Sequence, residues 1–117
     1  MRHALLLLLL VLFASSAPAK DGISDRTTFL NLVLDKTLSL QLFRVRLHVN
    51  EDGTIEGKGM GRPVRGFWEW QDGYFCRTLI WGNVDLGRNC QGVTIENGKL
   101  VFTSDRGAGA SAKFSLN

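Results

Sequence analysis

The sequence predicts a small, mainly β domain: an antiparallel meander of about seven short strands, curled into a half-barrel or small barrel, with one short N-terminal helix. Three observations predict this fold. Apolar and polar residues alternate over much of the chain after residue 38, and the dipeptides Asp72-Gly73 and Asn97-Gly98 mark tight hairpins. The third is that no strand–helix–strand repeat is visible. We expect the helix to pack against the sheet or to plug one end of it.

The first 19 residues have the features of an export signal. A basic start, Met1–His3, precedes an unbroken apolar run, Ala4–Phe13, and Ala17–Ala19 has the form of an A-x-A cleavage site. The apolar run is short for a membrane span. We therefore expect cleavage near Ala19, a periplasmic or secreted protein without a stable membrane anchor, and a single β-rich domain over residues 20–117.

The charge of the chain points to no polyanionic partner. The 14 basic and 11 acidic residues give a formal charge of +3, which falls to +2 without Arg2. Charges of both signs are spread evenly along the sequence, whereas nucleic-acid or acidic-membrane binding requires a clustered basic face. We expect no nucleic-acid partner.

The domain is expected to begin with the helix. Ser24 or Asp25 can cap it, and it is expected to end before Lys36. Its apolar residues fall at helical spacing: Phe29, Leu30, Val33 and Leu34.

A strand pattern starts at Leu38 and changes phase near Phe43, which indicates a bulge or bend within one strand. Arg44, Arg46 and His48 are expected to face outward. A turn over residues 50–53, with Gly53 in the left-handed region, is predicted to pair Val49 with Ile55.

The next strand carries a row of glycines on one side: Gly57, Gly59 and Gly61. Such a row marks a bend or the close approach of a bulky group. Either the rings of Trp68 and Trp70 fill the space over it, or the row leaves room for a ligand. Arg62-Pro63 is expected to break the chain before the following hairpin.

The hairpin about Asp72-Gly73 is the most informative stretch. A two-residue loop pairs Trp68 with Arg77 and Trp70 with Phe75, and directly paired residues share a face of the sheet. The face predicted to point inward carries Val64, Trp68, Trp70, Phe75, Arg77, Leu79 and Trp81.

The remaining predicted elements follow in order: a polar loop over residues 82–89, a second hairpin formed by 90–95 and 99–104, a flexible connection over 105–110, and a last short strand over 111–116.

The two cysteines, Cys76 and Cys90, are predicted to form a disulfide, as expected for an exported chain. Both hairpin registers place them on the outer face. The bond would close a loop of about fifteen residues, worth roughly 3 kcal/mol in the chain-entropy model. A redox-active or metal-binding pair would favour CxxC spacing, which is absent.

Arg77 has three possible roles, because a buried guanidinium is costly unless it has a partner. It can stack on Trp68 as a cation–π pair, bond an internal acid or loop carbonyls, or anchor an anionic ligand. We therefore take Trp68, Trp70, Arg77 and Trp81 as the candidate ligand-binding residues.

The sequence offers little for catalysis. His48 has no partner fixed by spacing, and the acidic residues lie mostly at predicted turns. The glycines of residues 57–62 fail the dinucleotide fingerprint, since no helix follows them. We expect no enzyme activity, catalytic residue, metal or cofactor.

Three segments resemble a group of small exported proteins from alphaproteobacteria: residues 61–77, Asn89-Cys90-Gln91 and residues 102–107. The resemblance covers roughly the last sixty residues and implies an exported, disulfide-bonded β-domain. Some members of the group are labelled dihydrodipicolinate reductase, which implies a larger two-domain nucleotide-dependent enzyme. This chain has no Rossmann unit, so that activity is disfavoured.

The leading hypothesis is a non-enzymatic binding or interaction module whose concave aromatic and Arg-lined face takes a small apolar or anionic ligand or a protein segment. The alternative is a structural envelope or inhibitor-like protein that acts through the surface loops 82–89 and 105–110.

Overall fold

The structure, a computed structural model, describes residues 21–117, so the predicted export signal lies outside the described residues. Within this range the chain forms nine strands, one α-helix and two short 3-10 helices. In chain order the elements are β1 (Asp21–Ile23), α1 (Arg26–Val33), β2 (Leu38–Leu40), η1 (Gln41–Phe43), β3 (Val45–Val49), β4 (Thr54–Gly59), β5 (Arg62–Gln71), β6 (Tyr74–Trp81), β7 (Val84–Glu96), β8 (Lys99–Thr103), η2 (Asp105–Gly107) and β9 (Ser111–Leu116).

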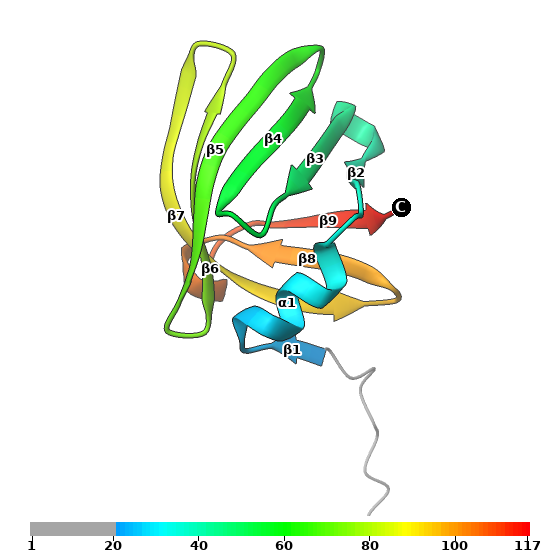
Figure 1. Cartoon of the computed structure of the whole chain (residues 1–117), viewed down its shortest axis with the longest axis vertical. Helices are drawn as coiled ribbons and strands as arrows, with labels where there is room; N and C mark the ends of the chain where they lie inside the picture. The colour runs from blue at the N-terminus through cyan, green and yellow to red at the C-terminus, as the bar shows by residue number, and fades with distance from the viewer. Residues whose placement is uncertain (1–20) are drawn as a thin grey trace, which may run out of the picture.

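Strands β2 to β9 form a closed antiparallel barrel of eight strands, in which each strand pairs with its neighbour in the sequence and β9 returns to β2 (Figure 1). The long strand β7 pairs with β6 through its first part and with β8 through its last part. β1 extends the sheet beyond the ring by pairing with residues 93–95 of β7. The predicted small barrel with one helix is therefore confirmed, and β1 is an element that the sequence pattern did not indicate.

The register of both predicted hairpins is confirmed. Trp68 pairs with Arg77, and Ile95 pairs with Leu100. Asp72 and Asn97 adopt positive φ values of 52° and 51°, each followed by a glycine of positive φ, as the tight turns require. The predicted pairing of Val49 with Ile55 is also present.

The helix α1 covers one end of the barrel (Figure 1). Asp25 caps it by accepting a hydrogen bond from the Thr28 N–H at 3.0 Å, and bonds from the backbone and side chain of Thr28 lower the pKa of this carboxyl. Phe29 is fully buried, and its ring lies 5.1–6.2 Å from four other rings, centroid to centroid. These are the rings of Trp68, Trp70, Phe75 and Phe102. None of the helices described here is long and apolar enough to cross a bilayer.

The phase change near Phe43 is a strand connection, so the predicted bulge within one strand is wrong. β2 and β3 are separate antiparallel partners, with Leu38 opposite Leu47, and η1 joins them. Arg44 closes η1 in the left-handed conformation, with φ 50°. A 3-10 turn that ends in a left-handed arginine carries no Gly or Pro signal, which explains the error.

The predicted chain break at Arg62-Pro63 is also wrong, because both residues lie in β5 opposite Gly59 and Lys58. The turn falls two residues earlier, at Met60-Gly61, where φ is 51° and 78°. Methionine is an unusual residue in a left-handed position.

The predicted polar loop over residues 82–89 is a third misassignment. The chain turns at Gly82, with φ 57°, and β7 starts at Val84. A register shift opposite Leu79 and Ile80 leaves Leu86 as the extra residue of a bulge. Asp85 and Arg88 lie on the outward side of β7, opposite Ile80 and Thr78, whereas Asn89 is the partner of the inward Arg77.

The cysteines form the predicted disulfide. Cys76 and Cys90 are direct partners of β6 and β7, on the outer side of the barrel wall. Cys76 is nevertheless only 1% exposed.

Replacing both cysteines by serine should lower the free energy of unfolding by about 3 kcal/mol, since the unfolded chain would regain the freedom of a closed loop. Urea unfolding of the double variant and of the reduced wild-type protein measures it. The double variant and the reduced wild-type protein should lose the same amount of unfolding free energy. Unfolding curves that coincide with that of the oxidised wild-type protein would contradict the prediction.

Phe29→Ala should lower the free energy of unfolding by about 3–5 kcal/mol, because the ring fills the centre of the core. The matched control is Phe67→Ala, whose ring is 70% exposed on the outer wall and whose loss should change stability by less than about 0.5 kcal/mol. Similar losses in the two variants would show that α1 does not anchor the core.

Candidate functional site

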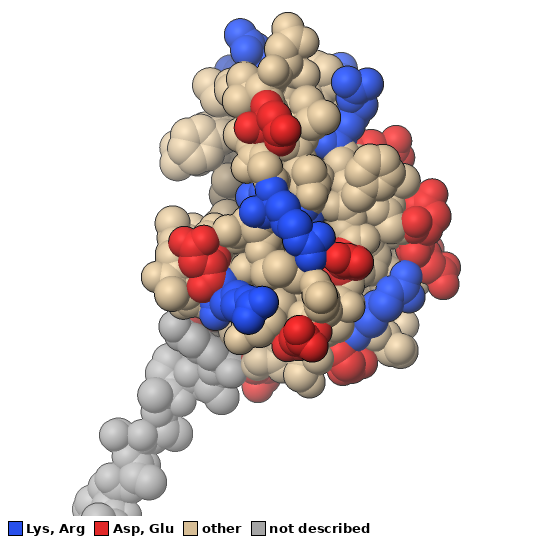
Figure 2. All heavy atoms as spheres, turned by 90° about the vertical axis from the view of Figure 1, so that its left-hand side faces the viewer, with Lys and Arg blue, Asp and Glu red and all other residues tan. Residues whose placement is uncertain are grey.

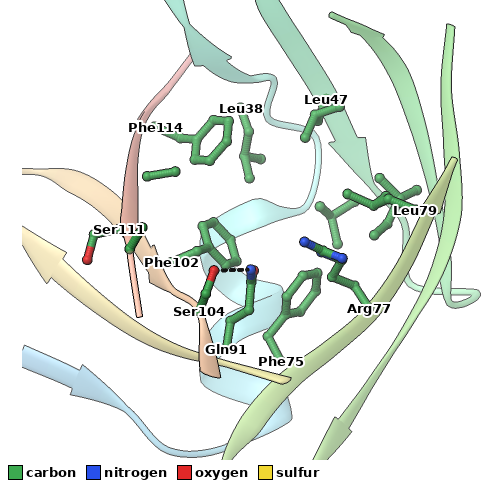
Figure 3. Close-up of a pocket in the computed structure, with 14 residues that line it drawn as sticks. Leu38, Leu47, Phe75, Arg77, Leu79, Gln91, Phe102, Ser104, Ser111 and Phe114 are labelled. Atoms are coloured by element: carbon green, nitrogen blue, oxygen red, sulfur yellow. Dashed lines mark hydrogen bonds between the residues drawn. The ribbon is translucent and has the colours of Figure 1, made fainter. Parts of the chain in front are cut away.

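The barrel interior holds a mainly apolar cavity of about 280 Å³. It lies between β6 on one side and β8 and β9 on the other (Figure 3). Two of its lining residues, Ala110 and Ser111, are exposed, so the cavity meets solvent beside the β8–β9 connection. The apolar lining comes from β2, β3, β4, β6, β8, β9 and the β8–β9 connection: Leu38, Leu47, Val49, Ile55, Phe75, Leu79, Phe102, Ala110, Ala112 and Phe114.

Arg77 is the charged residue of this cavity. Its position on the inner face of β6 follows from the hairpin register, and Figure 3 shows the guanidinium pointing into the space beside Phe75. One terminal nitrogen donates to the Gly87 carbonyl oxygen at 3.0 Å. None of the 14 lining residues is acidic, and in the part of the chain described here Arg77 forms no salt bridge.

Arg77 is half-buried, and this partial burial lowers the pKa of its guanidinium. Removing water from a cation disfavours its charged form, and a single carbonyl offsets only part of that cost. The guanidinium remains charged near neutral pH, because an arginine is effectively always protonated. The cavity thus combines apolar walls with one cation that lacks a counter-ion.

Gln91 and Ser104 place neutral polar groups beside the arginine. Gln91, in β7, is 9% exposed and donates from its amide nitrogen to the Ser104 hydroxyl at 3.4 Å. Figure 3 shows the two side chains meeting beside Phe102, with the Phe75 ring between Gln91 and Arg77. Sequence reasoning did not single out either residue, because a Gln or Ser in a strand carries no signal until the barrel has closed.

The three tryptophans do not line the cavity. Each indole N–H instead donates to a backbone carbonyl of another element: Trp68 to Asn50 at 2.8 Å, Trp70 to Ser24 at 3.1 Å and Trp81 to Gly59 at 2.7 Å. The structure therefore separates the predicted set, bringing Arg77 to the cavity while the tryptophans connect loops and strands.

The stacking of Arg77 on Trp68, one of the three roles considered, is not found among the described residues. The cation over the Trp68 ring is Arg26 of α1, at 5.2 Å from the centroid. Of the three roles considered for Arg77, bonding to a backbone carbonyl is present, although Gly87 lies in β7 and not in a loop, and the anchoring of an anionic ligand stays a prediction.

The glycine row has a different partner from the one expected. A side chain at Gly59 would lie 3.7 Å from the Trp81 indole nitrogen, and the residue opposite Gly57 in β5 is Val64. Trp81, rather than Trp68 or Trp70, thus packs over Gly59. A side chain at Gly57 would meet the Arg46 backbone, and Gly61 lies in the β4–β5 turn with open space beside it. None of the three glycines lines the cavity.

The remaining candidates for chemistry lie on the surface. His48 is exposed, and within residues 21–117 no three His, Cys, Asp or Glu side chains gather as metal ligands. Asp52 accepts bonds from the hydroxyl and N–H of Thr54, which lower the pKa of its carboxyl, so it serves a turn as predicted.

Comparison with known proteins adds no functional assignment: no protein-family model, curated protein or solved structure matches the chain.

Replacing Arg77 by methionine should leave the free energy of unfolding equal to wild type or higher, because the variant keeps an apolar stem and removes a poorly compensated charge. Arg88→Met is the matched control, since Arg88 is an exposed residue of the same type that pairs with Glu69 at 2.8 Å. It should change stability little. Chemical unfolding measures both, and a loss above about 2 kcal/mol for Arg77→Met alone would show that the arginine is structural.

Proposed function

We propose that this protein is a small, non-enzymatic binding module, exported to the periplasm or secreted, that holds a small amphiphile with an anionic head group in its barrel cavity. The observation that carries the proposal is the Arg77 guanidinium, which lies among apolar walls with a backbone carbonyl and no carboxylate as its partner. A ligand carboxylate or similar anion would complete its coordination by charge-assisted hydrogen bonds.

The chemistry around Arg77 supports an anionic head group. Arginine presents a fork of N–H donors that matches a carboxylate, and among residues 21–117 this fork makes one hydrogen bond, to the Gly87 carbonyl. The Gln91 amide and the Ser104 hydroxyl add neutral donors nearby. An acidic lining residue would repel an anion, and the cavity has none.

The opposite wall supports an apolar tail. Leu38, Phe102 and Phe114 line the cavity there, and all three are buried. A volume of about 280 Å³ lies just below the usual range for ligand sites, so the ligand should be small. A medium-chain fatty acid such as octanoate combines a short apolar tail with the required charge.

The disulfide supports the proposed compartment. A bond between Cys76 and Cys90 persists in an oxidising environment and is rare in a reducing cytoplasm.

Octanoate should bind more tightly than 1-octanol and octylamine, which have the same chain length but a neutral and a cationic head group. Titration calorimetry on the three compounds tests this. Arg77→Met should weaken octanoate binding by about tenfold or more and leave octanol unchanged, since only the charged contact is lost.

The control for this experiment is Arg88→Met, which removes an equal charge from the outer wall and should bind all three compounds as wild type does. If octanoate does not bind, or if the two arginine variants lose affinity equally, the anionic amphiphile is the wrong ligand class.

A further inference from the structure

Three large apolar side chains project from the end of the barrel opposite α1. Leu42 and Phe43 belong to the β2–β3 connection and are 80% and 50% exposed, and Met60 in the β4–β5 turn is 60% exposed. The two turns are joined, because the Met60 N–H donates to the Phe43 carbonyl at 3.0 Å. None of the three belongs to the buried core cluster.

Four cations flank these side chains: Arg44, Arg46, Lys58 and Arg62. All four are exposed, Arg46 and Lys58 are direct partners on the outer face of β3 and β4, and Arg62 lies over the Trp81 ring at 5.0 Å. We call these four cations and the three apolar side chains the rim.

The segments that build the rim contain no acidic residue over residues 36–50 and 57–68. On the adjacent β6–β7 hairpin, the Asp85 carboxylate accepts the Gly87 N–H at 2.8 Å. The even spacing of charge along the sequence did not reveal this cluster of cations, because strand pairing brings together cations that lie 12–18 residues apart. The basic face that linear inspection failed to find is therefore present.

The α1 end has the opposite charge. Asp25 caps the helix at this end. The β3–β4 turn, which contains Glu51 and Asp52, lies against the helix, because Arg26 of α1 donates to the Glu51 carbonyl at 2.9 Å. Asp72 occupies the β5–β6 turn at the same end. Strand β5 spans about 26 Å from Trp70, which contacts Phe29, to Arg62. The acidic groups of the α1 end and the cations of the rim are therefore well separated. On the face of the barrel that Figure 2 shows, Lys and Arg groups lie at the upper end and also further down, where they mix with Asp and Glu groups.

We propose that the rim docks on an anionic lipid surface. Leu42, Phe43 and Met60 enter the boundary between head groups and acyl chains, while the four cations contact lipid phosphates. The apolar groups stand on projecting turns rather than in a groove, which suits a fluid surface that needs no matching shape. The acidic α1 end faces away from the bilayer. This docking is reversible and does not depend on the ligand of the cavity.

Vesicle co-sedimentation tests the proposal on a chain that begins at Lys20, since residues 21–117 contain the whole barrel and its helix. The protein should bind vesicles of phosphatidylglycerol and phosphatidylcholine in equal amounts, but not pure phosphatidylcholine vesicles. Added salt should weaken the binding, because it screens the cations.

Two double variants separate the parts of the rim. Arg46→Gln with Lys58→Gln should weaken binding to anionic vesicles by roughly thirtyfold, and Phe43→Ser with Met60→Ser by about tenfold or more. All four positions are exposed, so the thermal unfolding midpoint should stay near that of wild type.

The matched controls carry the same changes elsewhere. Lys99→Gln with Lys113→Gln removes an equal charge from β8 and β9, and Phe67→Ser with Ile80→Ser removes exposed apolar groups from the outer wall. Both should bind within about twofold of wild type. Absence of binding to anionic vesicles, or equal losses in variants and controls, overturns the proposal. A third outcome also overturns it: the protein binds polyglutamate as tightly as anionic vesicles, and the Phe43 and Met60 substitutions do not change that affinity. This result would indicate an acidic protein partner.

Discussion

The packing of Phe29 against four aromatic rings is the interaction on which the rest of this structure depends. Its ring reaches residues of β5, β6 and β8, so one side chain of the helix joins both sides of the barrel. The helix fills the barrel only at that end. The space that it does not reach, between β6 and β9, is the cavity. The packed core and the cavity therefore share one interior, and the depth to which α1 enters the barrel sets the boundary between them.

The same interior assigns the polar groups their roles. Each tryptophan bonds a backbone carbonyl with its indole N–H, so the most conspicuous residues of the sequence serve to hold the elements together. Arg77 has one carbonyl contact and a fork of further donors. A charge that the protein itself satisfies only in part is a reason to infer binding, whereas an aromatic residue whose polar atom is already bonded is not.

The outer surface has its own asymmetry. Cations gather at the open end of β3–β5 and carboxylates at the α1 end, although both are distributed evenly along the chain. Antiparallel pairing produces this arrangement, because alternate turns of a meander lie at the same end of the barrel. The proposed ligand site inside the barrel and the proposed lipid-docking rim outside it would be compatible with one role, the handling of small amphiphiles near a membrane.

The sequence by itself determined the local features: the helix and its cap, the register at Asp72-Gly73 and Asn97-Gly98, and hence the inward Arg77 and the outward cysteine pair. These follow from φ preferences of turn residues and from the two-residue period of strands, which act between near neighbours. The turns at Arg44 and Met60 escaped prediction, since ordinary residues are held there in left-handed conformations by the surrounding sheet. Only the tertiary structure decided which inward residues line a cavity. Closure of β9 on β2 joins residues nearly eighty positions apart, and no local preference specifies which side chains then fill the interior and which leave it open.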